Sequence, residues 1–508
     1  MNKGIKSLKY TTLATLLLEI VTLASGLIMP RLVLSYFGST SNGLVSSITQ
    51  FLGFSTILRA GMGGAIRAAL YRPIADGDKD KISSIMAATE KHMNKIAAII
   101  AAAIGVFACI YPFFVIDEYN WLYAFTMVLV IGSGTLVENL FGIKCQILMQ
   151  ADQKYHISTM ISVISHVLVT LTSAAIIVLG GSMHAVKVGA VVAAFIKPLL
   201  LNLYVKKNYK INWKAEPDEK AIGQRWNAFF QQVAAVVNEN VSLVILTVLQ
   251  PLASVSVYTV HSMIVFNIRS IVNSFSMGTN STFGSLLASD KNEELKKTFF
   301  FVEWITFAVG CVLYSITAVM LTPFVNLYTA SITDVNYHRP VFGLIMVLSA
   351  FAFSIKHPYQ YLAEGAGKFR ETRTGAIVEV IVNISVSVLC VLRFGVIGVL
   401  IGALCACVIR TAEYAMFTFK NLLKHSTLHL IKHGLIVVLT FSGCLLAGKQ
   451  VMIFDCTDYM NWALNSVMVA ISSAVIVLAV SVLFYRKELS MLIGNLKNNR
   501  AKKRKAEI

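Results

Sequence analysis

Apolar segments long enough to cross a lipid bilayer recur along the whole of this 508-residue chain. Hydrophobic residues make up 56% of the sequence and charged residues only 14%. Because a bilayer core offers no water to backbone polar groups, such segments fold as helices that satisfy their own hydrogen bonds. A soluble globular protein would carry more charge. The chain is therefore predicted to be an all-α, multi-pass integral membrane protein.

Charged or turn-rich breaks divide the apolar sequence into about fourteen transmembrane helices. Each is close to the length that a bilayer requires. The expected helices are 10–36, 43–71, 83–115, 121–150, 156–179, 184–206, 223–249, 256–287, 298–326, 339–363, 374–392, 395–421, 430–448 and 460–485.

The net charge of +18 is distributed in a way that argues against nucleic-acid binding. Lysine and arginine gather in alternate short loops and in the C-terminal tail "NLKNNRAKKRKAEI", which is the positive-inside pattern of membrane proteins. This pattern places both termini in the cytoplasm, and an even helix count agrees because it puts both termini on the same side. We expect the tail to contact anionic membrane lipids. The basic loops are 72–82, 205–214, 288–297, 364–373 and 420–432.

Catalytic and metal-binding motifs are not evident. The eight cysteines mostly fall in apolar spans, and none forms a CxxC pair or a metal-spaced set with histidine. The stretch "GCLLAGKQ" (443–450) resembles a phosphate-binding loop, but Gln450 replaces the metal-binding Ser or Thr. We predict no catalytic residue, metal or cofactor, and hence a protein that is not an enzyme. If such a protein transports a substrate across the membrane, the energy for transport would come from an ion gradient, the membrane potential or downhill flow of the substrate.

An internal repeat links the two halves of the chain. The exit of the fourth helix, "CQILMQADQKY" (145–155), matches that of the tenth, "YQYLAEGAGKF" (359–369), at an offset of 214 residues. The stretch 185–197 pairs with 398–410 at an offset of 213, and "MGG" (62–64) pairs with "MGT" (277–279) at 215. Offsets within one residue of 214 across six helices predict two six-helix lobes. Because six is even, both copies cross the membrane in the same orientation, so the lobes are parallel.

The predicted organisation has four parts. The N-terminal lobe covers 1–210, the C-terminal lobe 223–421, two additional helices 430–485, and a basic cytoplasmic tail 486–508. Parallel repeats of this kind place a substrate cavity between the lobes, near the middle of the membrane.

Charged residues inside apolar helices are costly and indicate functional sites. Arg59 and Arg269 lie near the middle of the second and eighth helices, too deep to reach the membrane surface easily, and predict a basic, water-filled cavity for an anionic substrate. Guanidinium groups bind diphosphate through paired hydrogen bonds and stay protonated. The candidate substrate-binding residues are Arg59, Arg269, Arg31, Lys356, His357 and Arg67.

The same helices carry candidate ion-coupling or charge-balancing residues: Glu19, Glu239, Asn238 and Asn240. We expect Glu19 and Glu239 to be buried near basic partners, with Glu19 neutralising arginine and Glu239 taking part in cation coupling. For basic residues near cytoplasmic helix ends, structural ion pairs or snorkelling are favoured over substrate binding. These residues are Arg67, Lys144, Lys197 and Arg410.

Three stretches carry a resemblance to a known family. They are "MPRLVLSYFGSTSNGLVSSITQFLGF" (29–54), "NENVSLVIL" (238–246) and "FGVIGVLIGAL" (394–404). With the repeat, they resemble polysaccharide repeat-unit flippases of the multidrug/oligosaccharidyl-lipid/polysaccharide exporter superfamily. Many relatives are expected to carry an acidic residue on the second helix before the glycine, where this chain has Arg59.

The resemblance implies a V-shaped, two-lobed exporter that works by alternating access in the bacterial cytoplasmic membrane. Its substrate would be an oligosaccharide on a polyprenyl diphosphate carrier, with a proton or sodium ion and a polysaccharide polymerase as further partners. A lipid II flippase, also of fourteen helices, remains an alternative. A cation-coupled drug exporter fits less well, because such exporters favour anionic cavities. A membrane glycosyltransferase is disfavoured, because it would need a large outer catalytic loop and the sequence shows none between the expected helices.

Overall fold

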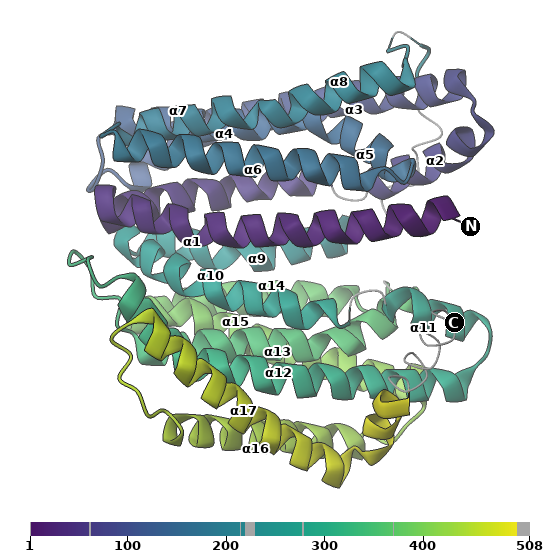
Figure 1. The fold of residues 1–508 in the computed structure, drawn as a ribbon, viewed down its shortest axis with the longest axis vertical. Helices are drawn as coiled ribbons and strands as arrows, with labels where there is room; N and C mark the ends of the chain where they lie inside the picture. The colour runs from purple at the N-terminus through teal and green to yellow at the C-terminus, as the bar shows by residue number, and fades with distance from the viewer. Residues whose placement is uncertain are drawn as a thin grey trace, which may run out of the picture. The chain divides into compact units, whose positions relative to one another are not determined.

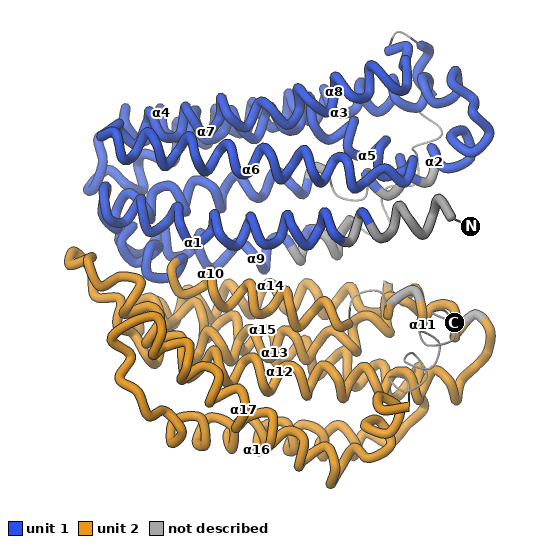
Figure 2. The backbone as a smooth tube through the Cα atoms, viewed as in Figure 1, with its two compact units in different colours: residues 1–259 blue, residues 260–508 orange. Residues whose placement is uncertain are grey.

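The computed structural model describes residues 2–59, 62–213, 215–218, 229–276, 279–368 and 370–494, with some side chains left out. Within these ranges the chain is helical and contains no β-strand. The chain divides into two compact units, residues 1–259 and 260–508 (Figure 2).

The first unit is built from helices that run side by side (Figure 1). Short non-α segments, the 3₁₀ helices η1 and η2 and the π-helix η3, interrupt several of them. The elements are α1 (Asn2–Gly53), η1 (Phe54–Arg59), α2 (Met62–Asp76), α3 (Lys79–Ile110), η2 (Tyr111–Phe114), α4 (Trp121–Val137), η3 (Glu138–Gly142), α5 (Ile143–Ala151), α6 (Tyr155–Val178), α7 (Met183–Ala194), α8 (Ile196–Tyr209) and α9 (Phe229–Leu249).

The boundary between the units falls inside α10 (Leu252–Ser274). The second unit continues with α11 (Thr279–Ala288), α12 (Asn292–Tyr328), α13 (Pro340–Gly365), α14 (Arg373–Phe394), α15 (Ile397–Phe417), the π-helix η5 (Thr418–Leu423), α16 (Leu428–Gln450) and α17 (Tyr459–Phe484).

The expectation of fourteen membrane helices is confirmed. Among the described residues, twelve helical segments are long and apolar enough to cross a membrane. The first of them, Leu13–Ile57, contains two expected helices joined at Gly38, where φ is 78°. Such a left-handed conformation is cheap only for glycine. The shorter apolar helix Val236–Leu249 corresponds to the expected seventh helix.

The expected second helix, 43–71, is interrupted. Its α-helical geometry ends at Gly53, η1 follows, and a new α-helix begins at Met62. The expected eighth helix is likewise divided, into α10 and α11. Because the repeat offset places 277–279 opposite 62–64, the two interruptions lie at equivalent positions of the repeat.

Close polar contacts join α1 to α9 and α10 within the first unit. Asn42 Nδ2 donates to Ser256 Oγ at 2.8 Å, and Ser47 and Thr247 hydroxyls lie 2.8 Å apart. A Cβ placed on Gly43 would lie 1.9 Å from the carbonyl oxygen of Leu252, so only glycine allows this approach. Small residues permit such close helix packing in membranes.

Similar close packing joins α14 and α15 in the second unit. Side chains at Gly398 or Gly402 would collide with the backbone of Val391 or with Ser387, so this small-xxx-small pair lets the helices touch. The additional helices α16 and α17 pack against α12 and against each other. Trp304 Nε1 of α12 donates to Ser481 Oγ of α17 at 3.0 Å.

A polar contact that is at least partly buried occurs at matching places in the two units. Glu90 on α3 pairs with Lys144 on α5, and Tyr359 on α13 donates its hydroxyl to Glu303 on α12 at 2.5 Å. Glu303 follows Glu90 by 213 residues and Tyr359 follows Lys144 by 215, both within one residue of the repeat offset of 214.

The lobe boundaries drawn from the sequence, with a C-terminal lobe starting at 223, stay a prediction.

Candidate functional site

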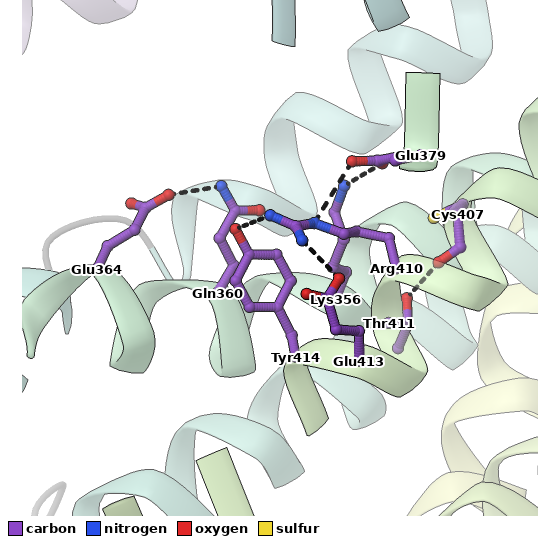
Figure 3. Close-up of polar contacts among 9 residues, drawn as sticks. All are labelled: Lys356, Gln360, Glu364, Glu379, Cys407, Arg410, Thr411, Glu413 and Tyr414. Atoms are coloured by element: carbon purple, nitrogen blue, oxygen red, sulfur yellow. Dashed lines mark hydrogen bonds and ion pairs between the residues drawn. The ribbon is translucent and has the colours of Figure 1, made fainter. Parts of the chain in front are cut away.

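Three neighbouring helices of the second unit contribute buried charges to one network (Figure 3). Lys356 on α13, Glu379 on α14 and Arg410 on α15 are 5%, 9% and 2% exposed. Each lies in an apolar helix, where an unpaired charge would cost several kcal/mol. The close packing of α14 on α15 brings the opposite charges within reach of one another.

The carboxylate of Glu379 bridges the two cations. Its Oε1 accepts from Lys356 Nζ at 2.9 Å, and its Oε2 lies 3.6 Å from Arg410 Nε. A buried charge is tolerated when it is paired in this way, although the pair itself contributes little net stability after desolvation. The network therefore fixes the relative positions of α13, α14 and α15.

Arg410 extends the network along α15. Its Nη1 lies 2.6 Å from Glu413 Oε2, and its Nη2 donates to the Tyr414 hydroxyl at 2.7 Å. The guanidinium carbon also lies 4.0 Å from the centroid of the Tyr414 ring, a cation–π contact. Gly375 of α14 faces this pair, because a Cβ there would lie 1.5 Å from Glu413 Oε2.

A third cation, Arg269, joins the site through an aromatic ring. The centroid of the Phe353 ring lies 4.5 Å from Arg269 Cζ and 4.5 Å from Lys356 Nζ. The Phe266 ring lies 4.7 Å from Arg269 Cζ. Aromatic faces stabilise cations, more strongly where water is excluded. Phe353 therefore holds two positive charges near each other, on α10 and α13.

His357 completes this basic group. The side chain is buried, and its ring lies 4.9 Å from that of Phe353 and 5.1 Å from that of Tyr361. Its Nδ1 has no hydrogen-bond partner among the described residues. A buried polar atom without a protein partner is costly, so this nitrogen is available to a polar group of a substrate or to water.

The sequence-predicted substrate residues thus separate into two sets. Arg269, Lys356 and His357 come together in the second unit, around Phe353. In the first unit, Arg67 Nη1 donates to Gln150 Oε1 at 2.8 Å, while Arg31 occupies an exposed position of α1. Arg59 is the last residue of η1, and its side chain lies outside the described part of the chain.

The candidate coupling residues differ from expectation in burial. Glu19 and Glu239 both occupy exposed positions, so the expectation that they are buried is wrong. Asn238 is half-buried on α9. Asn240 is buried, but its Oδ1 accepts from Gln50 Nε2 at 2.6 Å, which makes it part of the α1–α9 contact.

Of the four cationic residues expected in structural ion pairs, Lys144, Lys197 and Arg410 form them, whereas Arg67 contacts the neutral amide of Gln150. Lys144 pairs with Glu90, Lys197 Nζ lies 2.9 Å from Glu138 Oε1, and Arg410 pairs with two carboxylates.

The acidic partners in the second unit were missed. Glu379 and Glu413 lie 23 and 57 residues after Lys356, and no local pattern links them. The available signal was their own placement, since each is an acid within a predicted membrane helix. Phe353 could not be identified from the sequence, because phenylalanine is common in apolar helices and nothing local marks this one as functional.

Comparison with known proteins agrees with this architecture. Residues 228–389 match the MatE family model. No curated protein matches the chain. Among solved structures, a lipid II flippase, MurJ, in an inward closed conformation is similar with a TM-score of 0.67 and 15% identity, over 94% of this chain and 99% of that one.

MATE transporters are similar over a smaller share of the chain. An inward-facing multidrug resistance MATE transporter of the MOP superfamily has a TM-score of 0.60 and 15% identity, over 82% of this chain and 98% of that one. The Vibrio cholerae MATE transporter VcmN in its bent form has a TM-score of 0.51 and 14% identity, over 83% and 98%. The chain is a multi-pass membrane protein with the transporter fold that MurJ and MATE proteins share, and its residues 228–389 match the MatE family.

Proposed function

We propose that this protein is a flippase that moves a polyprenyl-diphosphate-linked oligosaccharide from the cytoplasmic to the outer leaflet, for cell-surface polysaccharide assembly. The observation that carries the proposal is the basic group of Arg269, Lys356 and His357 around Phe353 in an apolar surrounding. A diphosphate offers several charged oxygens to such donors, and charge-assisted hydrogen bonds of this kind are the strong ones.

The ion pair between Lys356 and Glu379 gives the site a way to respond to substrate. A diphosphate that approaches Lys356 competes with Glu379 for the ammonium group. Once released, Glu379 keeps Arg410 as a partner, so its charge stays balanced. Because α13, α14 and α15 are held together by these contacts, binding would favour a different arrangement of the three helices, which alternating access requires.

The two additional helices fit a lipid-linked substrate. Apolar side chains cover the outer surfaces of α16 and α17, among them Leu435, Leu439, Ile471 and Val475. The lipid II flippase structure matches 94% of the chain and the multidrug transporter 82%, a difference close to the share of the chain in residues 428–484. A polyprenyl tail needs such an apolar surface, whereas a small drug does not.

Lipid II is the second candidate substrate. It shares the polyprenyl diphosphate part, and a lipid II flippase is among the similar solved structures. The basic group recognises the diphosphate, which both substrates contain, and therefore does not separate them. A proton or sodium ion as coupling ion, a polysaccharide polymerase as partner and the bacterial cytoplasmic membrane as location complete the proposal.

Deletion of the gene tests the substrate. The proposal expects a lipid-linked oligosaccharide to accumulate on the cytoplasmic side of the membrane, with normal levels of lipid II. Accumulation of lipid II on that side would instead establish the second candidate. Accumulation of neither lipid, together with sensitivity to cationic drugs, would contradict both and favour a drug exporter.

A further inference from the structure

Glu303, His429 and His433 form a separate polar cluster in the second unit. Glu303 extends from α12, and the histidines lie four residues apart at the start of α16, so they share one face of that helix. One ligand atom from each of the three residues can be chosen so that all lie within 4.8 Å of one another. The closest pair, His429 Nε2 and Glu303 Oε2, is 2.9 Å apart.

We propose that this cluster binds a divalent transition-metal ion, with Zn²⁺ as the best fit. Two imidazoles and one carboxylate are a donor set that zinc uses when it keeps a fourth position open. Mg²⁺ and Ca²⁺ prefer oxygen ligands throughout. The inference is independent of the proposed transport function and of the network around Lys356.

Outer partners orient the proposed ligands. Tyr359 donates its hydroxyl to Glu303 Oε1 at 2.5 Å, and His433 Nδ1 lies 2.7 Å from the Tyr485 hydroxyl. Metal-bound histidines characteristically use their second ring nitrogen in a hydrogen bond, which fixes the tautomer and the ring orientation. With Nδ1 engaged by Tyr485, His433 presents Nε2 as its ligand atom.

The surroundings of the cluster favour a metal over a simple ion pair. Glu303 is 3% exposed, and the rings of His429 and His433 lie parallel, 6.0 Å apart. The ring of Phe419 stacks on His429 at 5.5 Å, which supplies an apolar wall. A salt bridge accounts for Glu303 and His429 alone, whereas a single metal ion also accounts for the second buried imidazole beside the same carboxylate.

Access to the cluster is from the side of His429. Its side chain is 27% exposed, against 3% for Glu303. In the proposal the ion enters from this side, and a water would take the fourth ligand position there. Because Tyr485 follows directly after α17, a bound ion would connect α12, α16 and the end of α17. We therefore expect metal to raise the thermal stability of the protein.

The test uses the full-length protein purified in detergent. Its metal content is measured by mass spectrometry before and after dialysis against EDTA, and its melting temperature is followed during titration with Zn²⁺ or Mg²⁺. We expect close to one zinc per chain before dialysis, a lower melting temperature after it, and recovery with Zn²⁺ but not with Mg²⁺. His429→Gln and His433→Gln should weaken zinc binding at least about tenfold.

His425→Gln is the matched control. His425 lies in the same segment, and its ring contacts Phe300 and Phe419, but it is outside the cluster. Zinc binding should survive this change. If His433→Gln does not fold, zinc binding by His429→Gln, a change at a half-buried position, decides the test. A wild type that binds no zinc and shows no zinc-dependent melting, or equal loss of binding in His425→Gln and His429→Gln, would overturn the proposal.

Discussion

Lys356 Nζ lies 2.9 Å from Glu379 Oε1, between two helices of an apolar bundle, and both side chains are buried. The same carboxylate also contacts Arg410, which has Glu413 as its second acidic partner. The two contacts fix three helices relative to one another. They also place a cation beside Phe353 that an anionic substrate can recruit only by competing with Glu379.

The first prediction concerns this pair. Glu379→Gln removes the charge that both bases share, and should lower the free energy of unfolding by about 3–5 kcal/mol, the usual effect of breaking a buried pair. Lys356→Met should cost less, because Glu379 keeps Arg410. Unfolding of the purified variants in mixed micelles measures both values. In the double variant the two losses should not add; strictly additive losses would show that the residues do not interact.

The second prediction concerns Gly375. A methyl group there would lie 1.5 Å from Glu413 Oε2 and 2.1 Å from Arg410 Nη1, so Gly375→Ala must displace this ion pair. We expect destabilisation of about 1–3 kcal/mol, as for overpacked sites. Gly443→Ala in α16 is the control, because nothing lies within 4 Å of a Cβ there. It should be neutral or stabilise by up to about 1 kcal/mol; equal melting temperatures for the two variants would contradict the packing.

Orientation gives a third prediction. The distribution of lysine and arginine places 205–214 in the cytoplasm and the loop around 457 outside. Single cysteines at Asn208 and Thr457, in a cysteine-free background, should differ in their reaction with an impermeant thiol reagent. Only position 457 should be labelled in intact cells. Labelling of position 208 from outside would reverse the topology.

Much of this architecture could be predicted from the sequence. Hydropathy locates the helices because the bilayer sets their length, and the basic residues Arg269, Lys356 and His357 stand out as charges in apolar helices. The break at η1 and Met62 was indicated only by neighbouring glycines, since a change from α to 3₁₀ geometry depends on packing.

Local sequence patterns do not identify which side chains pair between different helices. Glu379 meets Lys356 because α13 and α14 adjoin, and Glu303 meets His429 from 126 residues away. Only the i,i+4 spacing of His429 and His433 was visible. Exposure of Glu19 and Glu239 was misjudged because hydropathy gives the depth of a residue along a helix but not the direction in which it faces.

A fourth prediction addresses coupling. Glu239 is exposed on α9, so Glu239→Gln should still fold and insert into the membrane. If this carboxylate binds the coupling ion, the variant should lose the acceleration of transport by an imposed proton or sodium gradient. Glu19→Gln, at another exposed acid, is the control and should keep the response. A wild type that is indifferent to both gradients would exclude Glu239 from ion coupling.

The central claim is that Arg269 and its neighbours bind the diphosphate of a lipid-linked substrate during transport. The most direct test reconstitutes the purified protein into vesicles that contain a fluorescent polyprenyl-diphosphate oligosaccharide, and follows its movement between leaflets with an impermeant quencher. Wild type should accelerate this movement, Arg269→Ala should abolish it at equal protein content, and Arg269→Lys should retain part, because lysine keeps the charge but loses the paired geometry. Equal movement with wild type and Arg269→Ala, or none with wild type, would contradict the account.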